Sequence, residues 1–270
     1  MKRALFLHIA VIALAGCKAE PAAKGSASAA PEAVVEASAS AAPAPAAQAR
    51  AVSESTDLYE FDYAYPAAAA AIPGLKAWLE EDSARVKAKL VKDATAWQAE
   101  AKAGDIPFNA YAHSTKWDVV TDLPGWLSLS AQRYAFTGGA HGMPWSEGLI
   151  WDKAANAKRS ALDLFTSPAA LSAAIRAPFC AEIDRQRAKK RGEPIKPGST
   201  DMFDECIDPV KSQIILGSAD GQHFTRIGVL VDPYEAGPYA EGAYEVTLPV
   251  TAAVLKAVKD EYRGAFAAAR

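Results

Sequence analysis

A histidine and a glutamate stand close together near the middle of the chain, where they could support acid–base chemistry. His141 lies in the glycine-rich stretch Thr137–Pro144, and Glu147 follows on its C-terminal side. Such a pair acts as general base only when both side chains converge on one cleft and a nucleophile or metal completes the set. Neither Gly-x-Ser-x-Gly nor His-Glu-x-x-His occurs in the sequence. We therefore favour a histidine that caps backbone groups of its own turn, and keep the hydrolase as the alternative.

A second shaped loop, Pro233–Gly242, carries tyrosines and carboxylates that suit recognition. Tyr234 and Tyr239 can bury a large area at low entropic cost while each keeps a hydroxyl for hydrogen bonding. Glu235 and Glu241 could meet a basic protein or the amide of a sugar. Prolines and glycines alone would also explain a fixed loop shape, so a purely structural loop is the competing interpretation. A glycosidase would need a defined separation of the two carboxylates, which the sequence does not give.

Three cysteines divide into one N-terminal residue and a later pair. Cys180 and Cys206 form an even pair, and in an oxidising compartment we expect them to be bridged. Closing that loop would stabilise the fold by about 3.5 kcal/mol in the chain-entropy model. Two free buried thiols are the alternative. Metal binding is a more distant one, because no Cys-x-x-Cys or histidine pair has ligand spacing. We expect no metal and no cofactor.

The first cysteine, Cys17, ends what resembles a bacterial lipoprotein signal. Lys2 and Arg3 precede an apolar run, Ala4–Leu14, that is too short to cross a bilayer as a stable helix. Leu14-Ala15-Gly16-Cys17 then resembles a lipobox, which implies that residues 1–16 are a signal peptide and that Cys17 is acylated after cleavage. An ordinary signal peptide or a short anchor with a chance cysteine is the alternative.

Several acyl chains would attach the protein lastingly to a membrane. Position 18 is lysine rather than the aspartate associated with inner-membrane retention. By that resemblance we expect the protein to be anchored in the outer membrane and to face the periplasm. Residues 17–56 are mostly Ala, Pro, Ser, Glu, Val and Lys, with no aromatic residue. Such a composition cannot bury enough apolar surface to offset ordering entropy, so we predict a disordered tether.

The charge of the chain argues against a nucleic-acid partner. Without Lys2 and Arg3, the mature chain has 27 basic and 32 acidic residues, a net charge of −5 with histidine neutral. A nucleic-acid protein would show a basic excess or stripe. The one basic cluster is Arg185, Arg187, Lys189, Lys190 and Arg191. It falls near the end of a predicted helix, where the macrodipole favours cations, so we expect a solvated helix end.

The elements that must position both loops follow from periodicity. Residues 58–65 alternate aromatic and polar residues, which predicts a strand with one buried face. Residues 73–103 show an apolar stripe at helical spacing, and Ser167-Pro168 begins a second long helix that ends at Gly192. Further strands are predicted within 109–123 and at 126–136, 145–152, 213–216, 224–231 and 244–249, and a short helical turn at 162–165. Thr251 caps a final helix predicted to carry Val254, Leu255, Val258 and Tyr262.

One of these strands has two contrasting faces. Leu127, Leu129 and Ala131 share one face, whereas Ser128, Ser130 and Gln132 share the other. The second face should therefore meet solvent or a polar neighbour. Strands with long helices interspersed and several hairpins favour an α+β fold, with mainly antiparallel sheets packed with two long helices and a C-terminal helix. We expect two adjoining segments, 57–152 and 153–270, in one compact unit.

Several motifs together resemble the extracytoplasmic domain of RsiV-like proteins, a family that includes a lysozyme-sensing anti-sigma factor and the non-catalytic N-terminal region of the peptidoglycan deacetylase PdaC. They are Thr137–Gly142, Glu147-Gly148-Leu149, Leu162–Phe165, Val231–Gly242 and Glu245-Val246. The resemblance implies a binding or sensing domain of the bacterial envelope rather than an enzyme. Residues 57–152 correspond to the PdaC-like part, and residues 153–270 to the C-terminal RsiV-like part.

The sequence departs from the resembled proteins in two ways. It shows no sigma-binding segment with a transmembrane helix, and no deacetylase domain. We therefore expect a lipid-tethered recognition domain alone, whose ligand is a protein such as a lysozyme-type muramidase or a cell-wall glycan. The candidate ligand-binding residues are His141, Glu147, Tyr234, Glu235, Tyr239 and Glu241. A peptidoglycan hydrolase acting through His141 and Glu147, and a purely structural lipoprotein, are the alternatives.

Overall fold

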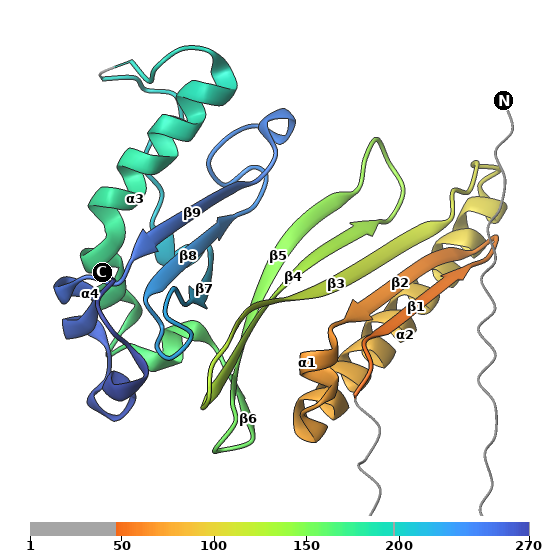
Figure 1. Cartoon of the computed structure of the whole chain (residues 1–270). Coiled ribbons are helices and arrows are strands. Elements are labelled where there is room, and N and C mark those ends of the chain that lie inside the picture. Colours follow the sequence, from red (N-terminus) through yellow and green to blue (C-terminus); the bar gives the residue numbers. More distant parts are fainter. Residues whose placement is uncertain (1–46, 197, 270) are drawn as a thin grey trace, which may run out of the picture. The chain divides into compact units, whose positions relative to one another are not determined.

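The computed structural model in Figure 1 describes residues 47–196 and 198–269. The predicted signal peptide, the lipidation site Cys17 and most of the predicted tether lie outside these residues. Within the described ranges, no helix combines the length and the apolar character that crossing a bilayer requires.

The N-terminal half forms a six-stranded sheet in the order β1-β2-β3-β4-β5-β6. The strands are β1 (Arg50–Ser55), β2 (Tyr59–Tyr65), β3 (Tyr111–Asp122), β4 (Trp126–Phe136), β5 (Met143–Asp152) and β6 (Ala157–Arg159). Neighbours are antiparallel except β2 and β3, which are parallel. A parallel pair needs a long crossover, and here the crossover contains α1 (Ala67–Ala70) and α2 (Pro73–Ala103).

The long helix α2 covers one face of this sheet because its apolar stripe matches the aromatic face of β2. Phe61, Tyr63 and Tyr65 are buried in β2, and Leu75 and Leu79 are fully buried in α2. Together with the apolar faces of β3, β4 and β5 they form one hydrophobic core. The predicted strand at 58–65 and helix at 73–103 are thus confirmed.

The tether ends earlier than the sequence predicted. Residues 50–55 form strand β1 rather than part of a disordered segment extending to residue 56. This stretch has few apolar side chains, but it pairs with β2 from Arg50 opposite Tyr65 to Ser55 opposite Glu60. Arg50 also pairs with Glu80, and Glu54 with Lys87, both on α2. An edge strand can rest on main-chain hydrogen bonds and charged contacts, and composition does not reveal these.

The C-terminal half adds a three-stranded antiparallel sheet and the second long helix. The strands β7 (Gln213–Gly217), β8 (Arg226–Val231) and β9 (Tyr244–Pro249) follow in that order. Helix α3 (Pro168–Arg191) starts at Ser167, whose side chain accepts a hydrogen bond from the backbone N–H of Ala170. It ends at Gly192, whose φ of 79° is typical of a glycine C-cap. A second core lies between α3 and the three-stranded sheet.

The final helix is shorter than predicted. Helix α4 spans Ala252–Ala257, and Val258 then turns to an extended conformation. There Val258 forms a β-bridge with Phe165, and the N–H of Lys259 bonds to the carbonyl of Leu164. The chain continues as the 3-10 helix η4 (Asp260–Ala265), which carries Tyr262. Tertiary pairing of Val258 therefore overrides the helical spacing of the apolar residues. The remaining 3-10 helices are η1 (Ala161–Leu164), η2 (Pro209–Lys211) and η3 (Tyr239–Glu241).

The layers follow the order α2, six-stranded sheet, three-stranded sheet, α3, as Figure 1 shows. The two sheets come closest where β5 meets β7. A Cβ on Gly148 would lie 2.9 Å from the carbonyl oxygen of Ile214 and 2.9 Å from a side-chain carbon of Ile215. Only glycine permits that approach. The expected α+β class with mainly antiparallel sheets and two long helices is confirmed.

Candidate functional site

Three aromatic rings from the two loops predicted to carry function lie in a row. The rings of His141 and Tyr239 are stacked, with centroids 4.0 Å apart, and Tyr234 lies 5.6 Å from Tyr239 on a tilted plane. The hydroxyl of Tyr239 donates to the carbonyl oxygen of Gly142 at 3.0 Å. The loops 137–142 and 232–242 are thus fastened to each other, although they are far apart in the sequence.

The outer members of this row are open to solvent. His141 is exposed, and Tyr234 exposes 47% of its surface. Met143, two residues after His141 in the chain, exposes 40%. We call His141, Met143, Tyr234 and Tyr239 the aromatic patch. Exposed apolar side chains that gather in one place often mark an interaction site.

The backbone at Tyr234 supports the same interpretation. Its φ of 74° lies in the left-handed region, which costs a bulky residue about 1–2 kcal/mol. Neighbouring bonds hold it there, since the N–H of Tyr234 bonds to the carbonyl of Gly237. Strained residues of this kind cluster at functional sites, where the surrounding structure fixes them. The exposed ring of Tyr234 gains little from burial that would offset the strain.

His141 and Glu147 do not form a catalytic pair in this structure. Nδ1 of His141 lies 2.9 Å from the carbonyl oxygen of Gly142, as expected for a ring that caps its own turn. Glu147 points to the α2 side of the sheet, where its carboxylate lies 2.8 Å from Nε of Arg133 and 3.7 Å from Nζ of Lys158. The two side chains therefore have separate partners.

Glu235 and Glu241 are likewise occupied separately. The carboxylate of Glu235 turns toward the buried Ser212 and accepts its hydroxyl at 2.6 Å. Burial raises the pKa of Glu235, the Ser212 hydrogen bond opposes this, and the nearby charge of Asp232 adds to it. Glu241 instead accepts from Nε of Arg191 at 2.8 Å and from the hydroxyl of Tyr244. Neither carboxylate is arranged as half of a glycosidase pair.

The basic cluster at the end of α3 is only in part the solvated helix end that the sequence predicted. Arg187 is fully buried and donates to the carbonyl oxygens of Ala236, Asp204 and Glu205. Lys190 donates to the carbonyls of Glu241 and Ala243. These cations therefore satisfy carbonyls of two loops. Arg185, which is exposed and paired with Glu182, and the exposed Lys189 do fit the original prediction.

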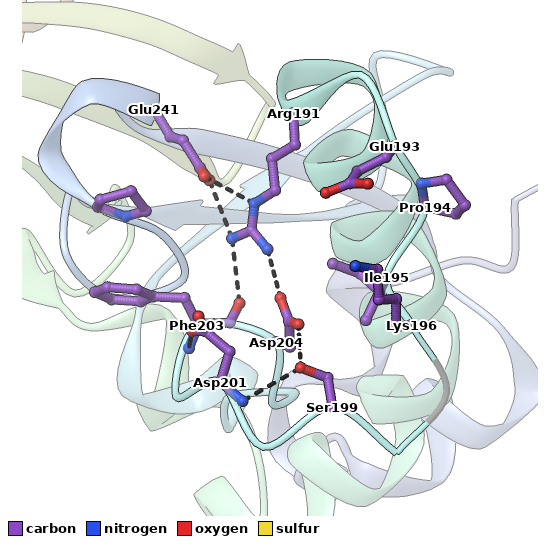
Figure 2. A pocket seen from close by; sticks show the side chains of 11 residues that line it. Arg191, Glu193, Pro194, Ile195, Lys196, Ser199, Asp201, Phe203, Asp204 and Glu241 are labelled. Carbon is purple, nitrogen blue, oxygen red and sulfur yellow. Dashed lines mark hydrogen bonds and ion pairs between the residues drawn. The ribbon is translucent and has the colours of Figure 1, made fainter.

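Arg191 occupies the centre of the hollow shown in Figure 2, which has a volume of about 410 Å³. Its guanidinium bonds to Glu241, to Asp204 and to the carbonyl of Phe203. The side chain is thus committed to joining the loop 232–242 to the segment 199–205. Arg191 therefore holds the loop that carries Tyr234 in place, and its guanidinium is not free to bind a ligand.

The predicted disulfide is confirmed. Cys180 on α3 is bonded to Cys206, with their Cα atoms 5.4 Å apart. Cys206 follows the two residues of the polar loop whose carbonyls bind Arg187. The bridge therefore holds the long polar loop against the same helix that anchors the aromatic patch. Among the residues that the structure describes, no group of three or more His, Cys, Asp or Glu side chains could hold a metal ion.

A buried ionic cluster under the six-stranded sheet was not foreseen from the sequence. Asp82 on α2 and Arg133 on β4 form an ion pair at 2.7 Å, with 3% of each side chain exposed. The hydroxyl of Tyr63 also donates to Asp82. Burial alone would raise the pKa of Asp82, but the hydrogen bond and charge of Arg133 outweigh burial and lower it. Polar residues on the buried face of an amphipathic helix were the available signal.

His113 should make the protein sensitive to acid. Burial, with a further contribution from Arg133, lowers the pKa of His113 from 6.5 to about 4. Below pH 6.5 the unfolded chain binds a proton at this residue, whereas the folded protein does not until about pH 4. Folding stability should therefore fall across that window, by about 2–3 kcal/mol in total once partial solvent screening is allowed for.

His113→Gln removes this contribution, so the free energy of unfolding should depend less on pH in the variant. Urea titrations of both proteins at about pH 7.5 and about pH 4.5 measure the difference. An identical acid loss in the two proteins would show that His113 does not remain neutral in the folded state.

Comparison with known proteins supports the resemblance seen in the sequence. Residues 52–144 match the family model described as Deacetylase PdaC. This match runs from β1 into β5, includes the loop with His141, and confirms the resemblance to a PdaC-type domain over those residues. No curated protein matches the chain.

The chain also resembles solved structures of the DUF3298 family. A DUF3298 family member from Bacteroides fragilis matches with a TM-score of 0.51 and 15% identity, over 81% of this chain and 95% of that chain. A DUF3298 family protein from Pseudomonas aeruginosa PAO1 covers 82% of this chain and 97% of its own, with 16% identity and a TM-score of 0.47. At this identity the first likeness shows the fold alone.

Proposed function

We propose that the chain is a non-catalytic binding domain, anchored by lipid at Cys17 to the outer membrane, that recognises a ligand of the periplasmic cell envelope. The observation that carries the proposal is the aromatic patch. It combines two exposed apolar side chains, a strained backbone at Tyr234 and anchoring by α3. A surface that is rigid and apolar before it binds loses little entropy on binding.

The proposed location follows from the N-terminal sequence, where a signal-like run ends in Leu14-Ala15-Gly16-Cys17. The disulfide fits the same compartment, because such bonds persist in the periplasm and are rare in the cytosol. The ligand that we propose is an envelope protein, such as a lysozyme-type muramidase, or a cell-wall glycan.

A hydrolase is the weaker candidate. Its proposed base, His141, is stacked on Tyr239, and its proposed partner, Glu147, is paired with Arg133 on the helix-covered side of the sheet. Catalysis would require both groups to reach one reacting atom. The separate partners favour binding over chemistry.

Tyr234→Gly should separate stability from binding. Glycine adopts a positive φ without strain, so the variant should be more stable by about 1 kcal/mol. Loss of the exposed ring should weaken binding to the envelope ligand by about tenfold or more, as expected for an aromatic contact residue. Urea denaturation and a binding panel of purified peptidoglycan sacculi, soluble glycan fragments and a lysozyme-type muramidase measure the two effects.

Asp105→Gly is the matched control. Asp105 also has a positive φ, 53°, but it lies in the exposed turn after α2. Its replacement should relieve backbone strain and leave binding unchanged. If Tyr234→Gly bound every member of the panel as tightly as the unaltered protein does, the aromatic patch would not be the recognition surface.

A further inference from the structure

A small pocket lies between the two sheets, next to the aromatic patch. Its volume is about 250 Å³. Small-molecule pockets usually measure about 300–1,000 Å³, so this one suits a single ring rather than an extended ligand. Pro144 and Pro233 line its wall. Pro144 directly follows Met143, and Pro233 directly precedes Tyr234, so the pocket and the patch are continuous along both loops.

The pocket lies where the layer between the two sheets has no apolar core. Most of each hydrophobic core lies between a sheet and its own helix, although Leu123, which follows β3, and Ile150 on β5 also belong to the core around α3. The face of β4 that turns toward the three-stranded sheet carries Ser128, Ser130 and Gln132, the polar face noted in the sequence. Among the described residues, the fully buried hydroxyl of Ser128 has no hydrogen-bond partner. This layer therefore contains polar groups for which the fold provides no hydrogen-bond partner.

The polar lining comes from both sheets. Ser130 and Gln132 contribute from β4, and Asp232 and Glu245 contribute from the end of β8 and from β9. Within the described part of the chain, the side chains of Ser130, Gln132 and Glu245 donate and accept no hydrogen bond. They provide hydroxyl, amide and carboxylate groups within one small volume.

Asp232 joins the sheets at this point. Its Oδ1 accepts the backbone N–H of Ser146 on β5 at 2.9 Å. Burial raises the pKa of Asp232, and hydrogen bonds from the backbone and the side chain of Ser146 only partly oppose this. The guanidinium of Arg133 does not neutralise the charge of Asp232, since the Arg133 side chain is bound to Asp82 on the opposite face of the sheet.

Ile215 and Leu230 complete the pocket with half-buried aliphatic surface. Short polar groups at the rim of an apolar wall match the chemistry of a sugar ring, which has hydroxyl and amide groups at its edge and C–H groups on its faces. A neighbouring exposed aromatic ring, here Tyr234, offers a surface for the next ring of the same chain.

We propose that this pocket is a subsite for one saccharide unit of a glycan whose adjoining unit lies against Tyr234. Gln132 and Ser130 bind its hydroxyl or acetamido groups, and Asp232 accepts a hydroxyl. The inference rests on the proposed function and deepens it, because it selects a glycan over a protein as the ligand.

Gln132→Met tests the subsite with little risk to folding, because Gln132 is exposed and the substitution keeps the length of the side chain. The probe is soluble chitotetraose, compared with maltotetraose, in calorimetric titrations against the whole mature protein. Chitotetraose should bind the unaltered protein more tightly than maltotetraose, which has no acetamido groups.

The effect of each substitution on the affinity for chitotetraose should depend on its position. Gln132→Met should weaken chitotetraose binding about tenfold through the loss of amide hydrogen bonds. Asp232→Asn should weaken it about fivefold, because the neutral amide is a poorer acceptor for a sugar hydroxyl. Gln98→Met, the same change as the first on the exposed side of α2, should have no effect.

The outcomes separate this inference from the proposed function. If chitotetraose binds but Gln132→Met and Asp232→Asn leave its affinity unchanged, the pocket is not the subsite. If only a lysozyme-type muramidase binds, and Tyr234→Gly abolishes that binding, the glycan assignment is wrong while the proposed function stands. If chitotetraose, purified sacculi and the muramidase all fail to bind, both proposals fail.

Discussion

Replacing Arg187 by methionine should destabilise the protein by about 3–5 kcal/mol, because several buried carbonyl groups would lose a charged donor at about 1–3 kcal/mol each. Arg187 is fully buried on α3, and its guanidinium donates to the carbonyls of Ala236, Asp204 and Glu205. Methionine fills much of the same volume but leaves these acceptors without their donor, and an unpaired buried polar group is expensive. Urea denaturation followed by tryptophan fluorescence measures the loss.

The same substitution should also loosen the aromatic patch, because Ala236 belongs to the loop that carries Tyr234. Arg185→Met provides the control on the same helix. Arg185 is exposed and pairs only with Glu182, so its replacement should leave the unfolding midpoint almost unchanged. Equal effects of the two substitutions would mean that α3 does not hold the recognition loop through Arg187.

Asp82→Asn should produce a loss of similar size, about 3 kcal/mol, under the six-stranded sheet. The change keeps the shape of the side chain but removes the negative charge that faces the buried guanidinium of Arg133. Arg133 would retain only Glu147, whose oxygen lies close to Nε although the N–H is not directed at it, and a long bond to Thr115. Denaturant titration again reports the change.

Two comparisons make the result specific. Asp93→Asn removes the carboxylate of an exposed pair with Lys89 on the same helix and should have little effect. The double variant Asp82→Leu with Arg133→Met should recover much of the loss, because a buried ion pair can often be replaced by apolar residues. A single Asp82→Asn variant as stable as the Asp93→Asn control would contradict the account of a buried charge pair.

The strands and long helices could be predicted because their patterns are local. The aromatic alternation of residues 59–65 and the Ser167-Pro168 start of α3 each report one buried face or one capped end. The predictions failed where a distant partner decides the structure. Strand β1 depends on pairing with β2, and the early end of α4 depends on the bridge between Val258 and Phe165.

The candidate site, too, could be predicted from the sequence only in part. Glycine and proline marked both loops, and the structure brings His141, Tyr234 and Tyr239 together while it assigns Glu147 to another face. The roles of Arg187 and Asp232 could not be predicted, because a charged residue near a helix or strand end looks solvated until its tertiary partners are known. The polar face of residues 128–132 was visible in the sequence, but its position against a second sheet was not.

The most direct test of the proposed function is a titration of envelope fragments with the mature protein and with Tyr234→Gly, both prepared with the Cys180–Cys206 bond intact. The unaltered protein should be retained in a saturable manner, and the variant should be retained at least about tenfold less tightly although it resists urea better. Retention that is equal for the two proteins, or absent for both, would contradict a recognition surface built on the aromatic patch.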